Sequence, residues 1–176
     1  MRLHFGLFIA ALCLLPAPNP APAQEKGAGI TMAADADAKD LGLPLYPGSR
    51  RHKDKDEDSN GLNFGLWGGG SGVKLAVIKM ESDDSMDKIA DYYKKRLSKY
   101  GKVLDCTHAS PSTDKDKDKD SDDPTKPLTC GDDKPDPGGV LFRSGTRPDQ
   151  YIVAIQPNPS GHGSLFQLVH LAHWQK

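Results

Sequence analysis

The chain has 176 residues, and its 23 Lys and Arg against 24 Asp and Glu give a formal net charge of −1. This length suits a single domain. The near-neutral balance provides no basic surface of the kind that binds nucleic acid or an anionic membrane, so we expect no nucleic-acid partner.

Residues 1–23 are typical of a secretory signal peptide. Arg2 precedes a short apolar run, and Ala21 to Ala23 supply the small residues of a cleavage site. The run is too short to span a bilayer comfortably, and no later apolar stretch approaches a membrane span. We therefore expect cleavage near Ala23, a mature chain without a transmembrane segment, and a secreted or periplasmic protein.

The start of the mature chain is small and polar, and residues 24–40 predict a flexible leader. Order is expected from residue 41, where two prolines and a Pro-Gly turn signal exclude a helix. Residues 51–59 form a charge run that ends at Asn60-Gly61, a strong hairpin turn. The run is therefore predicted to be an exposed strand that pairs across this turn.

Two strands are predicted next, over residues 62–67 and 73–80, with the glycine-rich residues 68–72 as the loop between them. In the second strand the odd and the even positions are both apolar. Apolar side chains on both faces indicate a central strand. The two sets are Val73, Leu75 and Val77 on one face and Ala76, Ile78 and Met80 on the other.

An amphipathic helix over residues 85–100 is the clearest element. Its apolar residues recur at spacings of three and four, which places them on one face. Acidic residues near its start and basic residues near its end match the helix dipole, and Gly101 supplies a left-handed exit. The apolar face consists of Met86, Ile89, Ala90, Tyr93, Leu97 and Tyr100.

Residues 102–107 predict a short strand, and residues 140–143, 151–156 and 164–174 predict three more. Residues 108–137 between them are polar and rich in Asp and Lys, which predicts a mobile insertion. Cys106 and Cys130 lie near its ends. Two cysteines in an exported chain indicate one disulfide, and their spacing makes a poor zinc site.

The order of strands, one helix and further strands predicts an α+β fold. We expect an antiparallel sheet of about five to six strands with one helix packed on one face, in a single domain over residues 41–176. The alternative is a half-barrel that curls around the same helix.

Residues 43–48 read Leu-Pro-Leu-Tyr-Pro-Gly, and residues 80–85 lead into a helix that carries Tyr92 and Tyr93 before Lys94, Lys95 and Arg96. In these features the chain resembles a group of uncharacterised exported bacterial proteins with a Tyr-Pro-Gly opening and a strand-helix unit. The resemblance implies no activity, and it transfers no site residue to this chain.

A calcium loop is one candidate site. Asp56, Asp58 and Asn60 stand at the first, third and fifth ligand positions of a D-x-D-x-N-G pattern, and calcium is the only cofactor suggested. The twelfth position holds Trp67 where a bidentate Glu is required. The simpler interpretation is a solvated charge run that leads into a turn.

Catalytic motifs are weak. The glycine-rich residues 68–72 lead into a strand and lack phosphate-loop spacing, and the sequence has neither G-x-S-x-G nor H-E-x-x-H. A hydrolase is nevertheless one hypothesis, with His162, His170 and Asp105 as its candidate residues.

Exposed aromatic side chains are the remaining candidates. Trp67 and Tyr92 are the predicted ligand-binding residues, although core packing is an equally simple interpretation. The favoured function is an exported, non-enzymatic binding or interaction domain that takes a small apolar ligand or a protein partner. The alternatives are a calcium-dependent module and a hydrolase.

Overall fold

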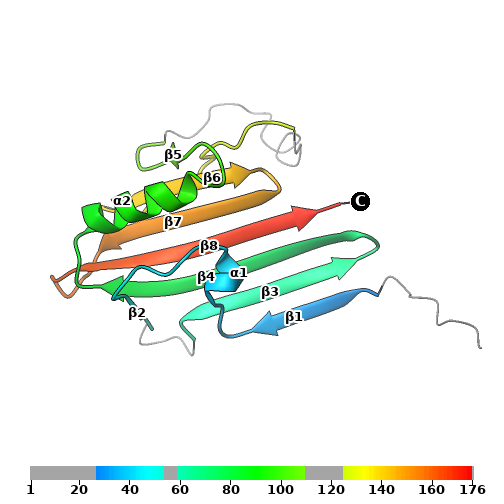
Figure 1. The fold of residues 1–176 in the computed structure, drawn as a ribbon, viewed down its shortest axis with the longest axis horizontal. Coiled ribbons are helices and arrows are strands. Elements are labelled where there is room, and N and C mark those ends of the chain that lie inside the picture. The colour runs from blue at the N-terminus through cyan, green and yellow to red at the C-terminus, as the bar shows by residue number, and fades with distance from the viewer. Residues whose placement is uncertain (1–26, 54–58, 110–124, 176) are drawn as a thin grey trace, which may run out of the picture.

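The computed structural model describes residues 27–53, 59–109 and 125–175. The described strands form one antiparallel sheet in the order β1-β3-β4-β8-β7-β6-β5, and β2 pairs with β4 (Figure 1). In chain order the elements are β1 (Gly29–Ala33), α1 (Ala38–Leu41), β2 (Arg50–Arg51), β3 (Gly61–Gly68), β4 (Ser71–Ser82), α2 (Met86–Leu97), β5 (Leu104–Asp105), β6 (Val140–Thr146), β7 (Asp149–Pro157) and β8 (Ser164–Trp174).

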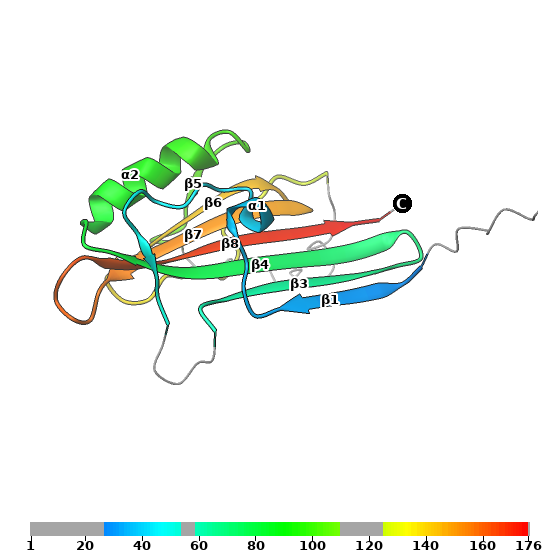
Figure 2. The same ribbon diagram turned by 60° about the horizontal axis from the view of Figure 1, so that its bottom comes forward.

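Both helices lie on the same side of the sheet (Figure 2). Side chains alternate between the two faces of a strand, so the even positions of β4 point toward the helices and its odd positions point away. Ala76, Ile78 and Met80 are buried on the helix side. We call this side the helix face and the other side the open face.

The core lies between α2 and the helix face of the sheet. Ile89, Tyr93 and Leu97 of α2 are fully buried, and Phe142 and Ile155 are buried among the strands beneath. The removal of these apolar groups from water is the main favourable term that holds the helix on the sheet.

Two buried serines anchor the ends of α2. The hydroxyl of Ser164 donates to the carbonyl of Asp84 at 3.0 Å, just before the helix begins. The hydroxyl of Ser144 donates to the carbonyl of Leu97 at 2.9 Å, in its last turn. Carbonyls at a helix end have no partner inside the helix, so Ser144 satisfies one of them and fixes that end on β6.

The predicted α+β fold, with an antiparallel sheet and a helix on one face, agrees with the structure. The predicted count of five to six strands is wrong, because the described residues contain eight. The strand predicted over residues 73–80 is central, since β4 lies between β3 and β8.

Two of the additional elements, β1 and α1, lie within the segment expected to be a flexible leader. Strand β1 pairs along β3 at the edge of the sheet, and its side chains are largely exposed, so no pattern of burial marked it in the sequence. Helix α1 begins with a capping box, in which Asp37 accepts from the amides of Lys39 and Asp40.

The charge run does not pair as expected. Arg50 and Arg51 form β2 and pair with Glu81 and Met80 of β4, not with residues 62–67 across the Asn60-Gly61 turn. Ion pairs explain the choice of partner, because Arg50 reaches Glu81 at 2.5 Å. Residues 54–58 of the run lie outside the described residues.

Two glycines between β7 and β8 provide a matched test of the fold. Gly161 and Gly163 both have positive φ, of 86° and 72°, but only at Gly163 would a Cβ collide with backbone, namely the carbonyl of Ser82. Gly161→Ala should therefore cost about 1 kcal/mol from the left-handed backbone alone, and Gly163→Ala should cost at least about 2 kcal/mol. Urea denaturation of both variants measures the difference, and equal losses would contradict the close approach of the loop to β4.

Candidate functional site

Two tryptophans lie in one row across the strands, on the helix face at the end of the sheet away from α2. Residues directly opposite one another across the strands are Gly29, Trp67, Gly72 and Trp174, from β1, β3, β4 and β8. A Cβ at Gly29 would overlap the ring of Trp67, and a Cβ at Gly72 would overlap the ring of Trp174. Each indole therefore rests on the backbone of a glycine in the neighbouring strand.

The outer surfaces of these indoles reach solvent. Trp67 is 39% exposed and Trp174 is 44% exposed, which is high for side chains of this size. We call the row formed by Gly29, Trp67, Gly72 and Trp174 the tryptophan ledge.

A polar row borders the ledge on the same face. Thr31 of β1, Lys74 of β4 and Asp149 of β7 belong to the next row of residues across the sheet. The ammonium of Lys74 lies 3.7 Å from a carboxylate oxygen of Asp40. The ledge thus combines two exposed apolar rings with hydrogen-bonding groups along one side.

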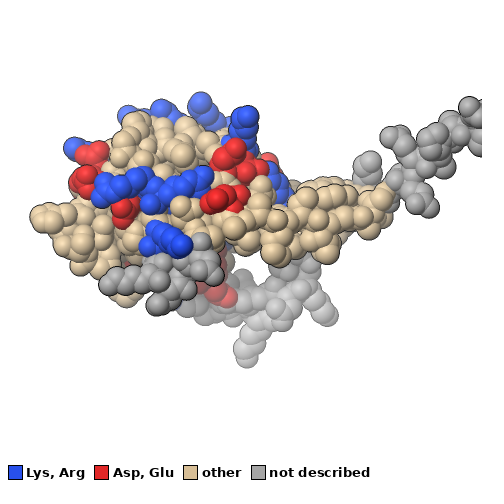
Figure 3. Space-filling view, turned by 90° about the horizontal axis from the view of Figure 1, so that it is seen from below, with Lys and Arg blue, Asp and Glu red and all other residues tan. Residues whose placement is uncertain are grey.

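The end of the sheet that carries the ledge projects beyond the helices (Figures 1 and 2). Seen from below, the projecting part bears no charged side chain (Figure 3). Strands β1 and β3 contain no Asp, Glu, Lys or Arg.

The open face is the second candidate surface. Its three central rows are apolar across β3 and β4, and β1 extends two of them with Ile30 and Met32. Ile30 and Met32 are 68% and 72% exposed, and Leu66 is 44% exposed. The apolar side chains on this face are Ile30, Met32, Leu62, Phe64, Leu66, Val73, Leu75, Val77, Ile152, Val169 and Leu171.

A hollow of about 470 Å³ lies at the tip of the β3–β4 hairpin. Its lining includes Trp67, Gly72 and Trp174 of the ledge as well as Leu66, Val73 and His173. By the register of the strands the first three belong to the helix face and the other three to the open face, so the hollow lies where the two faces meet at the tip of the hairpin.

The structure does not bring together the two predicted ligand-binding residues. Trp67 forms the ledge, whereas Tyr92 lies on α2 near the other end of the sheet (Figure 1). The ring of Tyr92 packs edge-on against Tyr46 and Tyr93, with centroids 5.1 Å apart in both pairs. Its hydroxyl donates to the carbonyl of Leu45 at 3.3 Å. Tyr92 thus packs the segment before β2 against the helix.

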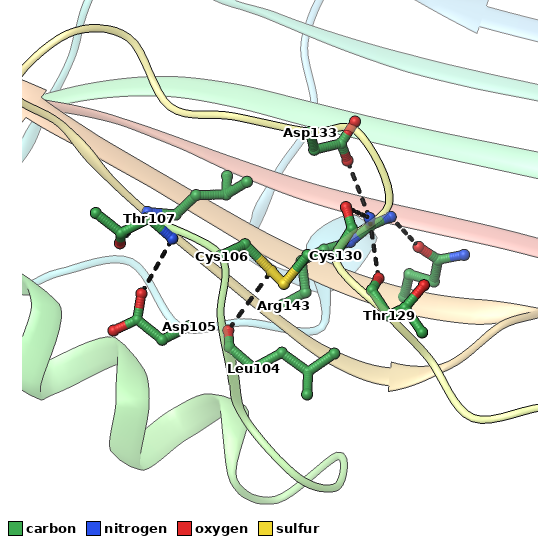
Figure 4. Close-up of a disulfide and its surroundings, with 10 residues drawn as sticks. Leu104, Asp105, Cys106, Thr107, Thr129, Cys130, Asp133 and Arg143 are labelled. Carbon is green, nitrogen blue, oxygen red and sulfur yellow. Dashed lines mark hydrogen bonds and ion pairs between the residues drawn. A yellow bond between two sulfur atoms is a disulfide. The ribbon is translucent and has the colours of Figure 1, made fainter. Parts of the chain in front are cut away.

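The predicted disulfide between Cys106 and Cys130 is present, with 5.4 Å between the two Cα atoms (Figure 4). Arg143 of β6 holds the segment that carries Cys130: its guanidinium donates to the carbonyl of Cys130 at 2.9 Å and pairs with Asp133 at 3.0 Å. The later part of the predicted insertion is therefore fixed on the sheet, while residues 110–124 lie outside the described residues.

Of the proposed calcium ligands, Asp56 and Asp58 lie outside the described residues. The side-chain oxygen of Asn60 accepts from Arg51 at 3.4 Å, and its carbonyl accepts from the amide of Lys79 at 2.9 Å. Within residues 27–53, 59–109 and 125–175, no three His, Cys, Asp or Glu side chains are arranged to hold a metal ion.

The residues of the hydrolase hypothesis are dispersed. His170 lies on β8 and Asp105 on β5, with β7 and β6 between these strands. The ring nitrogens of His170 lie 2.7 Å from a carboxylate oxygen of Asp149 and 3.0 Å from the carbonyl of Asp40. Asp105 accepts from the amide of Thr107, and His162 lies in the loop between β7 and β8.

A charged cluster joins β2 to β4. His52 Nδ1 lies 2.8 Å from Glu81, and Arg50 bridges Glu81 and Asp83. The hydrogen bond with His52, followed by that from Arg50, lowers the pKa of the Glu81 carboxyl below its usual value. The cluster is structural, because its charges are used to hold the short strand in place.

No family model, curated protein or solved structure matches this chain. None of the helices described here is long and apolar enough to cross a membrane. The resemblance to exported bacterial proteins with a Tyr-Pro-Gly opening stays a prediction.

Removal of the disulfide should destabilise the fold. Cys106→Ala combined with Cys130→Ala frees a loop of 24 residues, for which the chain-entropy model gives a loss of about 3 kcal/mol. Denaturation in urea with and without reductant measures this loss. Reductant should lower the midpoint of the natural chain and leave that of the double variant unchanged; insensitivity of the natural chain would contradict the bond.

The Glu81 cluster predicts loss of stability in acid. Since the folded state lowers the pKa of Glu81 from its ordinary 4.5, its contribution is complete above that value and is lost as the pH falls through the folded pKa. Glu81→Gln should therefore flatten the fall in melting temperature between about pH 5 and 3. Asp91→Asn, on the exposed side of α2, is the matched control; an equal effect there would contradict the role of the cluster.

Proposed function

We propose that this chain is an exported, non-enzymatic binding domain and that its ligand surface is the tryptophan ledge. The observation that carries the proposal is the pair of indoles, each supported by a glycine and each presenting its outer surface to solvent. Each ring is already fixed by the backbone beneath it, so a ligand that stacks on the ledge does not have to order it first.

The chemistry of the ledge suits a saccharide. A pyranose ring has apolar C–H faces and a rim of hydroxyls, so it stacks on an aromatic face and forms hydrogen bonds at its edge. The two indoles supply the aromatic faces. The polar row of Thr31, Lys74 and Asp149 lies where it can exchange hydrogen bonds with hydroxyls.

The spacing of the ledge favours a chain of sugars over a single one. Trp67 and Trp174 lie on strands separated only by β4, which places their backbones roughly 10 Å apart. An extended β-linked polysaccharide presents the same face at every second ring. An oligosaccharide of three or more units can therefore contact both indoles.

The charged residues beside the ledge are consistent with a binding role that needs no catalysis. Asp149 accepts a hydrogen bond from His170 at 2.7 Å, and Lys74 pairs with Asp40. These contacts hold charged groups in place at the border and leave the apolar centre to the ligand.

Intrinsic fluorescence tests the proposal directly, because the chain contains two tryptophans and both belong to the ledge. Hexasaccharides of β-linked glucose and of β-linked N-acetylglucosamine, and soluble peptidoglycan fragments, should change the emission in a saturable way. Trp67→Ala and Trp174→Ala should each weaken binding about tenfold, with the remaining tryptophan as the reporter.

Leu66→Ala is the matched control, since Leu66 neighbours Trp67 in the chain but lies on the open face. It should leave saccharide affinity unchanged. An emission that no saccharide alters, or an equal loss with Leu66→Ala, would refute the ledge as a saccharide site.

A further inference from the structure

The open face exposes apolar side chains that no helix covers. A strand with apolar residues on both faces is normally covered on both, yet α1 and α2 lie on the helix face only (Figure 2). Phe64, Leu75 and Leu171 lie directly opposite one another at the centre of the uncovered side. We propose that a second copy of this chain covers the open face, sheet against sheet, in a symmetric dimer.

The area of the open face fits a dimer. The exposed fractions of its apolar residues amount to an accessible area on the order of 600–800 Å² per copy, against about 800 Å² for one side of a standard interface. Patches on monomeric proteins reach roughly 300–600 Å², so this one is large for a surface that stays in water.

The distribution of charge favours an identical partner over a charged one. Across β1, β3 and β4 the three central rows contain no charged side chain. Charges begin with Lys79 and Glu81 further along β4, and with Arg143 where the row of Leu62 and Val77 reaches β6. In a twofold arrangement the same apolar patch meets itself, so no like charges are brought together at the centre. The net charge of −1 adds little repulsion between copies.

The charged segment over residues 114–120 is poorly suited to the same place. The acidic and basic residues 114–120 alternate as Asp and Lys and carry no apolar side chain that could replace water on this face. A second open face supplies apolar residues of matching extent. Two such sheets pack about 10 Å apart with their strands crossing at roughly 30°.

The dimer would leave the tryptophan ledge free, because the ledge lies on the opposite face of the same strands. The inference does not depend on saccharide binding. A monomer that binds saccharide would contradict the dimer and support the ledge. A dimer that binds no saccharide would support the dimer and contradict the ledge.

Sedimentation equilibrium of the purified exported chain, from about 1 to 100 μM, measures self-association. The natural chain should sediment with twice the mass of one copy, and its melting temperature should rise with concentration. Met32→Glu and Leu66→Glu, each tested alone, should weaken association at least about tenfold, because each introduces a charge where two apolar faces meet.

Ala33→Glu is the matched control. It adds the same charge to the same exposed strand, but on the helix face, so it should leave the dimer intact. The use of two separate open-face variants keeps the test decisive if one of them fails to fold, which circular dichroism detects.

Three results would overturn the proposal. A natural chain that is monomeric over the whole range rules out a second copy, and lipid found by mass spectrometry of its organic extract would then identify the occupant of the face. A dimer that withstands both open-face variants forms through another surface. Equal weakening by Ala33→Glu would show an effect of charge alone.

Discussion

The pairing of β4 with β8 fixes which side chains meet on each side of the sheet. The ladder runs from Gly72 opposite Trp174 to Ser82 opposite Ser164, and it joins the β3–β4 hairpin to the β7–β8 hairpin. A slip of one residue would send every side chain of one strand to the other face. The same register therefore places Trp174 over a glycine at one end and Ser164 beside the start of α2 at the other.

The placement of the helices explains why the ledge is uncovered. Helix α2 packs on β6 and β7, and the helix over β4 and β8, α1, has only four residues. Neither helix reaches the end of the sheet that carries the ledge (Figure 1). There the sheet protects its own backbone with Trp67 and Trp174, which cover Gly29 and Gly72.

Elements whose apolar residues recur with the period of a helix or strand and are buried were predictable from the sequence. Elements whose side chains stay exposed were missed. Ile89, Tyr93 and Leu97 recur at helical spacing, and all three are buried in the core. Strand β1 carries no such signal, because backbone hydrogen bonds to β3 hold it at the edge while its side chains stay largely exposed. Trp67 was identifiable as an exposed aromatic, but its partnership with Trp174 depends on strand register, which local periodicity does not specify.

Successive side chains of a strand point to opposite faces of the sheet, so the same strands can form two surfaces whose residues are separate. Leu66 and Trp67 are adjacent in β3, yet one belongs to the open face and the other to the ledge. On the helix face, glycine is required wherever an indole rests on a neighbouring strand; on the open face the same strands need bulky aliphatic side chains. Gly29 of β1 and Gly72 at the start of β4 meet the first demand, and Ile30 and Val73 beside them meet the second. A strand that served only a buried core would have no reason to keep these two glycines.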